Sequence, residues 1–517
     1  MTPWITLALL CGRPTVAAEA PALIEADTAW TAADSPWHVG QAVTIAAGAT
    51  LTIEPGVRVE VDEGVGITVL GALVAAGDDD GAVVFTRTDD HDGVGAWAGI
   101  TFTADSESAL FEQVDTWVGG SRLEGCELRY GARAVLIQGA SPLIRGCAFA
   151  HNSYEPEGSD SQGGAAIRII DGSRARIEGN SFDDNHVGGW GYGGAIEVLE
   201  ADPLILGNHF EGNSSVYGGA LCLQTSQGAI LGNSFVGNVV EGEGGAVALY
   251  SSAGAFMDNT ITDNESVFDG GGVHVCVDCK PHAAPWATDN VIVDNTSRAI
   301  GAGGFGAAWL RGFMWNDIHG NVRGDSPADL QWTNVEQADY PAWVHSPVVP
   351  HNWWGTTDPD AIEETIVDGE DEDEYGVVDW QPPADGPIAA PTPRAVITTP
   401  QIRYEQTFDA APIHLVLYNP GQARELELRL LLRFDDAHLV PYTRDLGVPE
   451  LEASGDAWRV SMPADSAIFA PIHDPGTGTA DLPPGVRWIA ILYDADSGEM
   501  IGEPLETPVL FDDGGAR

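Results

Sequence analysis

Two short phrases alternate through the middle of this chain and constrain its fold more than any other feature. One phrase has the form Phe-x-x-Asn and begins at Phe149, Phe182, Phe210 and Phe235. The other is a pair of glycines before small or apolar residues, and it begins at Gly163, Gly193, Gly218, Gly244 and Gly270. Because the two phrases alternate at a period of roughly 20 to 35 residues, the sequence indicates a repeat architecture.

A Cys or Asn marks the same place in successive repeats. These anchors are Cys126, Cys147, Asn180, Asn208, Asn233, Asn259, Asn290 and Asn316. Within each unit the apolar residues alternate with period two, as at Ile196 and Val198 or at Leu221 and Leu223. Such alternation, punctuated by Gly and Asn, predicts short strands separated by tight turns.

We therefore predict an all-β fold, a right-handed parallel β-helix whose equivalent positions stack about 4.8 Å apart. The anchor asparagines would form a hydrogen-bonded ladder between coils, and Phe182, Phe210 and Phe235 would stack inside. Gly-Gly would permit positive φ where the chain bends between sheets. Since one coil cannot bury its own apolar face, neighbouring coils and caps must supply the stability.

The paired phrases Phe-x-x-Asn and Gly-Gly-Ala-(Ile/Leu/Val) resemble the repeats of the polymorphic outer-membrane proteins. More broadly, they resemble bacterial right-handed β-helix repeat proteins. The resemblance covers roughly residues 120–325. It implies the fold, and it implies little about activity.

The flanks suggest further domains. An apolar run and the small-residue phrase Ala18-Glu19-Ala20 predict a signal segment over residues 1–20. Residues 21–118 would form the N-terminal cap and first coils, and residues 119–381 the remaining coils and C-terminal cap. A Pro-rich linker at 382–393 precedes strand-like runs that predict an immunoglobulin-like β-sandwich over 394–513.

The charge balance narrows the range of partners. The 517 residues include 77 Asp+Glu and 23 Lys+Arg, a formal net charge of -54. This charge argues against binding nucleic acid or an anionic membrane surface. No apolar run is long enough for a transmembrane helix. We expect an exported protein, at the cell surface, in the periplasm or outside the cell, with no obligatory cofactor and with Ca²⁺ as the candidate ion.

One candidate site is the outward face of the strands that follow Gly-Gly. If Ile196 and Val198 point inward, Glu197 points outward, and the same register selects Arg168 and His274. These three residues are the catalytic candidates for a pectate-lyase-like lyase or a glycoside hydrolase, with Arg168 and Glu197 as a surface ion pair. Three rungs separate His274 from Glu197, about 14 Å, which is too far for a shared proton transfer. The column also lacks a glycosidase carboxylate pair.

The second candidate site is the set of loops between Phe-x-x-Asn and Gly-Gly. Their aromatic and acidic residues fall on one corner of successive coils: Tyr154, Trp190, Tyr192, Tyr217, Phe268, Glu241 and Glu243. Aromatic faces beside carboxylates suit stacking on sugar rings, so we expect a glycan or a surface protein to bind along this ridge. The alternatives are aromatics that pack their own loops and a purely structural spacer.

The cysteines allow several interpretations. Cys126 and Cys147 occupy the same place in consecutive coils, so they either form a disulfide or replace ladder asparagines with thiols. Cys276 and Cys279 could form a local disulfide in an exported protein. Together with His274 and His282 they could instead bind zinc. Cys222 is left without a predicted partner.

Overall fold

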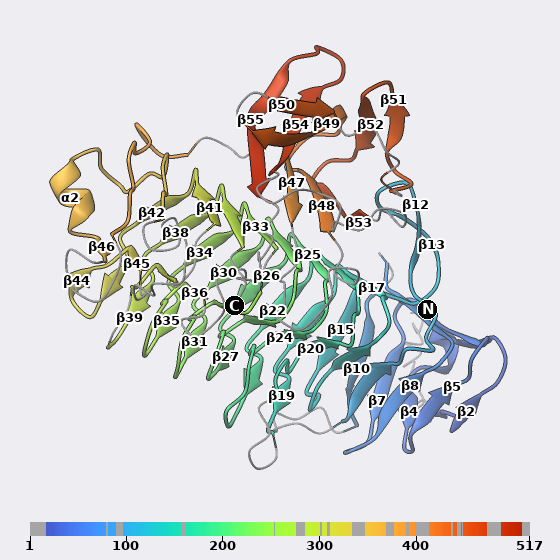
Figure 1. Cartoon of the computed structure of the whole chain (residues 1–517). Coiled ribbons are helices and arrows are strands. Elements are labelled where there is room, and N and C mark those ends of the chain that lie inside the picture. Colours follow the sequence, from blue (N-terminus) through green and yellow to red (C-terminus); the bar gives the residue numbers. More distant parts are fainter. Residues whose placement is uncertain are drawn as a thin grey trace, which may run out of the picture.

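A computed structural model describes residues 17–78, 81–88, 97–156, 162–252, 254–275, 285–299, 302–307, 311–332, 347–368, 377–388, 392–398, 413–435, 438–441, 446, 448–472 and 487–508. The chain coils into a long solenoid, and a smaller C-terminal β domain packs on its side (Figure 1). Three long parallel sheets line the solenoid, in agreement with the predicted parallel β-helix.

Sheets A and B share two faces of every coil. In order, the described strands of sheet A are β1 (Ala18–Glu19), β4 (Trp37–Val39), β7 (Arg58–Val61), β10 (Val83–Arg87), β15 (Cys126–Arg129), β18 (Ala148–Ala150), β22 (Ser181–Asp183), β26 (His209–Glu211), β30 (Ser234–Val236), β34 (Thr260–Thr262), β38 (Val291–Val293) and β42 (Asp317–His319). Those of sheet B are β2 (Leu23–Ile24), β5 (Val43–Ile45), β8 (Gly66–Val69), β11 (Gly99–Phe102), β16 (Val135–Gln138), β20 (Ile167–Ile170), β24 (Ile196–Leu199), β28 (Leu221–Gln224), β32 (Val247–Tyr250), β36 (Val273–Val275), β40 (Phe305–Ala307), β45 (Leu330–Trp332) and β46 (Ile366–Val367).

Sheet C and a narrow corner sheet complete the coils. The described strands of sheet C are β3 (Thr28–Trp30), β6 (Thr50–Ile53), β9 (Ala72–Ala76), β14 (Arg122–Glu124), β17 (Leu143–Arg145), β21 (Arg176–Glu178), β25 (Leu204–Leu206), β29 (Ala229–Leu231), β33 (Ala255–Met257), β37 (Trp286–Thr288) and β41 (Arg311–Met314). The corner sheet holds β19 (Ser153–Tyr154), β23 (His186–Val187), β27 (Ser214–Ser215), β31 (Val239–Val240), β35 (Glu265–Ser266), β39 (Thr296–Ser297), β43 (Val322–Arg323) and β44 (Ser326–Pro327).

The first strand lies inside the predicted signal segment 1–20. Ala18 and Glu19 pair with Trp37 and His38 of the next coil, and Ala20 is buried in the core. The folded solenoid therefore begins before the end of that predicted segment.

An aromatic column runs through the core, as predicted. Phe149, Phe182, Phe210 and Phe235 stack on one another with ring centroids 4.7 to 5.0 Å apart. Offset-stacked aromatic pairs at this spacing stabilise a core beyond their area burial. The chain bends next to this column at the glycine pairs, where Gly193 has φ 59° and cannot carry a side chain without strain.

Buried asparagines tie successive coils together in two ladders, one of which was predicted. The predicted ladder ends on Asn352 and runs through Asn180, Asn208, Asn233, Asn259, Asn290 and Asn316. The second ladder uses the asparagines of Phe-x-x-Asn and ends on Asp329: Asn152, Asn185, Asn213, Asn238, Asn264, Asn295 and Asn321. After the first asparagine of each ladder, which accepts only a backbone N–H, each Oδ1 accepts a backbone and a side-chain N–H from the preceding coil. Buried amide groups are therefore satisfied.

The predicted disulfide between Cys126 and Cys147 is wrong, because both residues are free, buried thiols. The backbone N–H of Cys126 donates to the Cys147 sulfur at 3.4 Å, and the N–H of Cys147 donates to Oδ1 of Asn180 at 2.9 Å. The two thiols therefore extend the first ladder, which was the alternative interpretation. Cys222 is also a free buried thiol.

Three short elements decorate the solenoid. A 3-10 turn, η1 (Ala32–Asp34), follows β3, and an antiparallel hairpin of β12 (Leu110–Glu112) and β13 (Thr116–Gly119) projects beside sheet C. At the far end, α2 (Pro359–Glu363) begins after its N-cap Asp358 and leads into β46. This helix and strand occupy the stretch 359–367 at the C-terminal end of the coils.

The C-terminal domain consists of two antiparallel sheets, consistent with the predicted sandwich; its immunoglobulin-like type stays a prediction. One sheet contains β47 (Arg394–Thr398), β48 (Ile413–Asn419) and β53 (Ser466–Ile472). The other contains β49 (Arg424–Asp435), β50 (His438–Pro441), β51 (Glu452–Ser454), β52 (Ala457–Met462), β54 (Arg487–Asp494) and β55 (Met500–Pro508). Leu415 and Leu417 of the first sheet share a core with Leu426 and Leu428 of the second.

The domain is docked on sheet C. An apolar cluster joins Val396, Val416 and Tyr418 of the domain to a patch on β25, β29, β33 and β37. Arg394 donates two hydrogen bonds of 2.8 Å to the carboxylate of Asp289, and Tyr418 donates one of 2.6 Å to Asp258. A charged and an apolar interface together hold the domain to the coils.

Candidate functional site

The loops between the two repeated phrases stack beside the corner sheet along the solenoid. In the coils from β19 to β39, the chain passes through a two-residue corner strand, makes a loop, and then enters sheet B. Equivalent loops therefore stack, and an isolated parallel bridge joins Tyr192 to Tyr217 of the next coil. The loop residues between the two phrases form one continuous surface, which we call the ridge.

Three tyrosines pack together at the centre of the ridge. The rings of Tyr192 and Tyr217 are stacked with centroids 5.1 Å apart. The ring of Tyr250 stands nearly perpendicular to both, with centroids 6.0 Å away. Tyr250 was not predicted as a ridge residue, although it ends the strand β32 that follows Gly244-Gly245. The three rings form a preorganised aromatic surface.

Ridge aromatics differ in how far they reach the solvent. Trp190 is 64% exposed and Phe268 is 44% exposed, whereas Tyr192 and Tyr217 are half-buried. The tyrosine hydroxyls at 192 and 217 make no hydrogen bond with the described residues, and burial raises the pKa of both. They stay protonated and can donate to a ligand. The ridge thus combines exposed indole and phenyl faces with free hydroxyl donors.

Acidic residues lie beside these rings. Glu241 is exposed, and Glu243 is about one-third exposed. The Tyr250 hydroxyl donates to Oε2 of Glu243 at 3.2 Å, and burial raises the pKa of Tyr250 far above its ordinary value. Glu243 is therefore held in one orientation and offers its free lone pairs at the surface as acceptors.

The outward column on sheet B has the predicted register but not the predicted exposure. Arg168 pairs with Glu197, and the same position continues through Cys222 and Ala248 to His274. Glu197 and His274 are both buried, because the ridge loops fold back over the face that we expected to be open. The catalytic candidates Arg168, Glu197 and His274 do not form an open groove.

Arg168 and Glu197 form a buried ion pair, which corrects the prediction of a surface pair. Arg168 Nε lies 2.6 Å from Oε2 of Glu197, and that oxygen also accepts the N–H of Gly163 at 2.8 Å. Burial raises the pKa of Glu197, while the charge of Arg168 and the Gly163 N–H oppose the rise. Gln224 donates to the second oxygen at 3.1 Å. This network holds the loop against the sheet.

Tyr154, at the start of the ridge, belongs to the same network of polar contacts as Arg168 and Glu197. The guanidinium of Arg133 lies over the Tyr154 ring at 3.9 Å, and the Tyr154 hydroxyl donates to Gln162. Gln162 in turn accepts from Arg168 at 2.8 Å. Tyr154 therefore packs its own loop, as the alternative interpretation of the aromatics had it, and we remove it from the ligand-contacting set.

His274 lies beneath the ridge between two carboxylates. Its Nε2 is 3.3 Å from Oε2 of Glu243, and its Nδ1 is 3.3 Å from Oδ2 of Asp269. Both are ion-pair contacts outside hydrogen-bond geometry. Burial opposes the charged form of His274, but Asp269 and the negative charge of Glu243 outweigh it and raise its pKa. The contact of His274 with Oε2 of Glu243 therefore helps to fix the position of that carboxylate.

A glycine on the next coil leaves space for the Asp269 carboxylate beside His274. Gly306 pairs with His274, and a Cβ at this position would stand 2.1 Å from Oδ1 of Asp269. The same Asp269 oxygen accepts the N–H groups of Gly270 and Ala302. Asp269 is thus fixed by two backbone donors, and its other oxygen faces His274.

The predicted zinc set cannot be assembled from the described residues. Cys276, Cys279 and His282 lie outside them, as does the predicted Cys276–Cys279 disulfide. His274 itself is engaged by Asp269 and Glu243.

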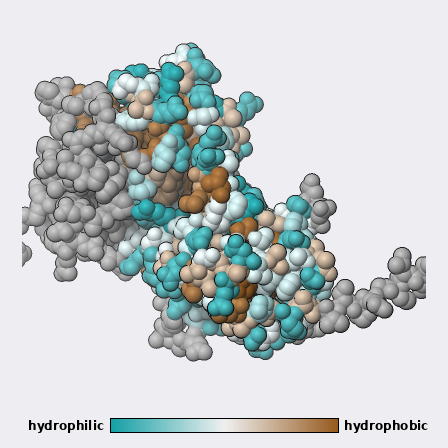
Figure 2. Space-filling model, turned by 90° about the vertical axis from the view of Figure 1, so that its right-hand side faces the viewer, coloured by the Kyte–Doolittle hydropathy of each residue, from teal (hydrophilic) through white to brown (hydrophobic). Residues whose placement is uncertain are grey.

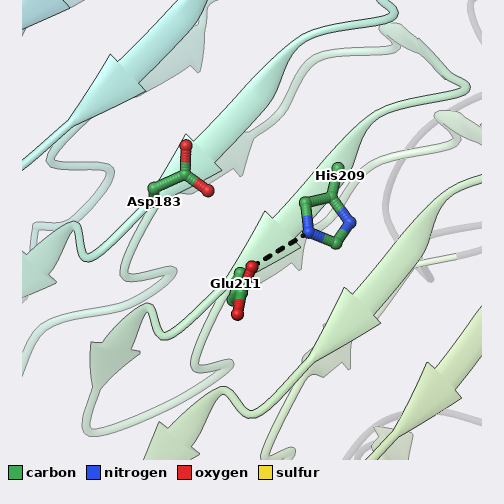
Figure 3. A group of neighbouring side chains, drawn as sticks. All are labelled: Asp183, His209 and Glu211. Carbon is green, nitrogen blue, oxygen red and sulfur yellow. Dashed lines mark hydrogen bonds and ion pairs between the residues drawn. The ribbon is translucent and has the colours of Figure 1, made fainter.

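Another group of possible metal ligands lies on sheet A (Figure 3). Ligand atoms of Asp183, His209 and Glu211 all lie within 4.8 Å of one another, on adjacent strands β22 and β26. An imidazole with two carboxylates suits Zn²⁺ better than Ca²⁺, which takes oxygen ligands. The ion pair of His209 with Glu211, at 3.3 Å, accounts for one of these contacts without a metal. We assign no metal to this exposed group.

Comparison with known proteins bears on the fold alone. A family model described as right handed beta helix region matches residues 114–312. The solenoid is a right-handed parallel β-helix. No curated protein matches the chain. No helix within the described ranges has the length and apolar character needed to cross a membrane.

Among solved structures, the enzymatically active domain of bacteriophage CBA120 tailspike protein 4 was found at 10% sequence identity. The match covers 95% of this chain and 64% of the tailspike chain, with a TM-score of 0.21. The chain thus spans less than two thirds of the tailspike chain, and a TM-score this low carries no argument about function.

Proposed function

We propose that this protein is an exported surface solenoid that binds a glycan along the ridge without cleaving it. The observation that carries the proposal is the tyrosine cluster of Tyr192, Tyr217 and Tyr250 with the exposed Trp190 beside it. Rigid aromatic surfaces with neighbouring hydrogen-bonding groups are typical of sites that hold sugar rings. The resemblance of the repeats to those of polymorphic outer-membrane proteins is consistent with a surface location.

Charge supports a neutral or amine-bearing glycan. The ridge presents Glu241 and Glu243, and the whole chain carries a net charge of -54. A polysaccharide of uronic acids would be repelled by this field, whereas sugar hydroxyls can donate to the carboxylates. The free hydroxyls of Tyr192 and Tyr217 supply donors for sugar oxygens.

The alternatives are an enzyme acting on the parallel-sheet face and a structural spacer. The burial of Glu197 and His274 favours binding over catalysis, since a polymer cannot reach these groups. A spacer would not need the buried ion pairs that position Glu243 at the surface. A protein partner remains a second occupant of the same ridge.

The test is a glycan array followed by calorimetric titration of any neutral glycan that binds. Trp190→Ala and Tyr192→Ala should each weaken binding at least about fivefold, because an aromatic stacking contact is worth about 1 to 3 kcal/mol. Leu110→Ala, which removes an exposed apolar side chain on the hairpin away from the ridge, is the matched control and should bind normally. Uniform absence of glycan binding, or unchanged affinity in both ridge variants, would refute the proposal.

A further inference from the structure

A cavity of about 230 Å³ lies where the C-terminal domain meets the solenoid. The solenoid contributes Ser141, Arg174, Arg176 and Leu204, and the domain contributes the run Ala467–Ala470 of β53. The hairpin β12–β13 forms a third wall. Figure 2, which looks onto the right-hand side of Figure 1, shows hydrophobic residues reaching the surface in this middle part of the molecule.

Most of the cavity wall is apolar. Phe111 and Val114 come from the hairpin, Leu204 from sheet C, and Ile468 and Phe469 from the domain. Cavities lined by such side chains accept apolar ligands, and a dry cavity of roughly 150 Å³ is large enough for benzene. A volume of about 230 Å³ therefore has room for a benzene-sized group with one small polar substituent.

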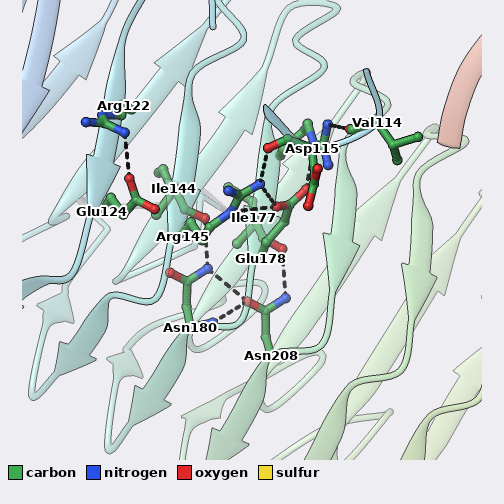
Figure 4. A network of polar contacts seen from close by, with 11 residues as sticks. Val114, Asp115, Arg122, Glu124, Ile144, Arg145, Ile177, Glu178, Asn180 and Asn208 are labelled. Carbon is green, nitrogen blue, oxygen red and sulfur yellow. Dashed lines mark hydrogen bonds and ion pairs between the residues drawn. The ribbon is translucent and has the colours of Figure 1, made fainter. Parts of the chain in front are cut away.

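Arg176 gives one side of the cavity a positive charge. Arg176 donates to the Val114 carbonyl and to Glu178, with its guanidinium 4.3 Å from the centre of the Phe111 ring. Arg145, which is not among the residues that line the cavity, also donates to Glu178 (Figure 4), so the guanidinium groups of Arg145 and Arg176 share one carboxylate. The local balance of these groups is positive, in a chain with 77 acidic and 23 basic residues.

Arg174 supplies a further positive charge with no direct partner. Its side chain is exposed at the cavity and makes no hydrogen bond or ion pair with the described residues. Asp202 is near enough to feel its charge, but burial raises the pKa of that carboxyl and its Oδ1 is engaged by Gln227. Glu450 is the acidic residue on the cavity wall, so a ligand with one negative charge matches the site better than a dianion.

We propose that this cavity binds a small aromatic or aliphatic monocarboxylate. The apolar group would lie among Phe111, Leu204 and Phe469, and the carboxylate would pair with Arg174 at the mouth. Arginine suits this role because its planar fork pairs with a carboxylate through two hydrogen bonds. Since the walls come from both the solenoid and the C-terminal domain, an occupant stabilises the docked arrangement by mass action.

The experiment titrates benzoate into the full-length protein by calorimetry, with benzyl alcohol as the neutral analogue. We expect saturable binding of one benzoate per chain, at least tenfold weaker binding of benzyl alcohol, and a higher melting temperature in saturating benzoate. Arg174→Gln should weaken benzoate binding at least tenfold, and Ala470→Leu should block it by filling the cavity. Arg323→Gln, which removes a cation from the corner sheet instead, is the charge control and should leave binding unchanged.

Two results would overturn the proposal. One is a lack of saturable benzoate binding to the folded wild-type chain. The other is benzoate affinity that is equal in wild type and Arg174→Gln, or equal for benzoate and benzyl alcohol. Arg174 is exposed, so its replacement should leave the circular dichroism spectrum unchanged. Loss of binding in Ala470→Leu with a retained spectrum locates the ligand in the cavity.

Discussion

Replacing Asn233 by Ala should test how much one rung of a ladder contributes to stability. The side chain is 2% exposed and takes part in five hydrogen bonds. Its amide nitrogen donates to Oδ1 of Asn259 and to the carbonyls of Ile205 and Leu231, while its Oδ1 accepts the backbone and side-chain N–H groups of Asn208. Alanine removes all five.

The size of the destabilisation depends on which hydrogen-bond partners of Asn233 keep another partner in the Asn233→Ala variant. The Asn208 side chain still donates to the Ile177 carbonyl, and the Leu231 carbonyl still accepts from Gly207. The backbone N–H of Asn208 is left buried without its acceptor, which costs about 1 to 3 kcal/mol. Together with a net loss of about 1 kcal/mol for each of two further bonds, we expect a destabilisation of about 3 to 5 kcal/mol.

Guanidinium unfolding followed by tryptophan fluorescence measures the loss, and hydrogen exchange locates it. Coupling in a solenoid acts mainly between neighbouring coils, so protection should fall most in the coils next to residue 233. Val239→Ala, in the same coil at a side chain that is 40% exposed, is the control and should cost less than about 1 kcal/mol. A loss for Asn233→Ala no larger than the control's, or a uniform fall in protection, would refute the reasoning.

Three further predictions concern buried carboxylates and their neighbours. Burial raises the pKa of Asp329 from 3.8 to about 6, so the native state loses stability as the pH rises between those values. The Asp329→Asn variant should therefore be more stable than wild type at pH 7.5, by at most about 3 kcal/mol. Calorimetry should show equal stability of the two proteins near pH 4. Asp258, also raised to about 6 by burial, should behave alike, and Asp258→Asn should raise the melting temperature at pH 7.5 while Tyr418 still has an oxygen to donate to. Gly306→Ala should displace Asp269 and lower the melting temperature, whereas Gly386→Ala, where a Cβ meets nothing within 4 Å, should not.

The scaffold was predictable because every coil repeats the same contacts. The ladder asparagines at 180, 208, 233, 259, 290 and 316, the phenylalanine stack and the glycine bends all behave as predicted. The register of Arg168, Glu197 and His274 was also correct, since it follows from strand alternation alone. Repetition converts a sequence period into a spatial neighbour relation, and no long-range information is needed.

Exposure was harder to predict than register. Glu197 and His274 were expected on an open face, and both are buried because loops from the same coils fold over them. The path of an irregular loop depends on contacts such as those of Arg133 with Tyr154 and Gln162, which lie in different coils and have no sequence period. Alternation shows which side of a sheet a residue is on and does not show what covers that side.

One sequence feature of β25, a run of apolar residues without alternation, reflects the docking of the C-terminal domain. Leu204, Ile205 and Leu206 are all apolar and all buried. In a strand with one solvent-exposed face, apolar and polar residues should alternate. Leu204 and Leu206 point away from the core and pack against the domain. The pattern indicated that something covers β25, and only the tertiary contacts of Arg394 and Tyr418 identified it.

By itself, the sequence determined the coil, its register, one of its two ladders and the corner at which variable loops emerge, because these depend on contacts repeated between adjacent coils. The tertiary structure decided which side chains reach the solvent, which thiols extend a ladder, and where two arginines meet an apolar wall. Those outcomes depend on single contacts between distant residues, such as Arg176 with Val114 or Tyr418 with Asp258, 160 positions apart. A contact that occurs once has no period, and so the sequence pattern could not predict it.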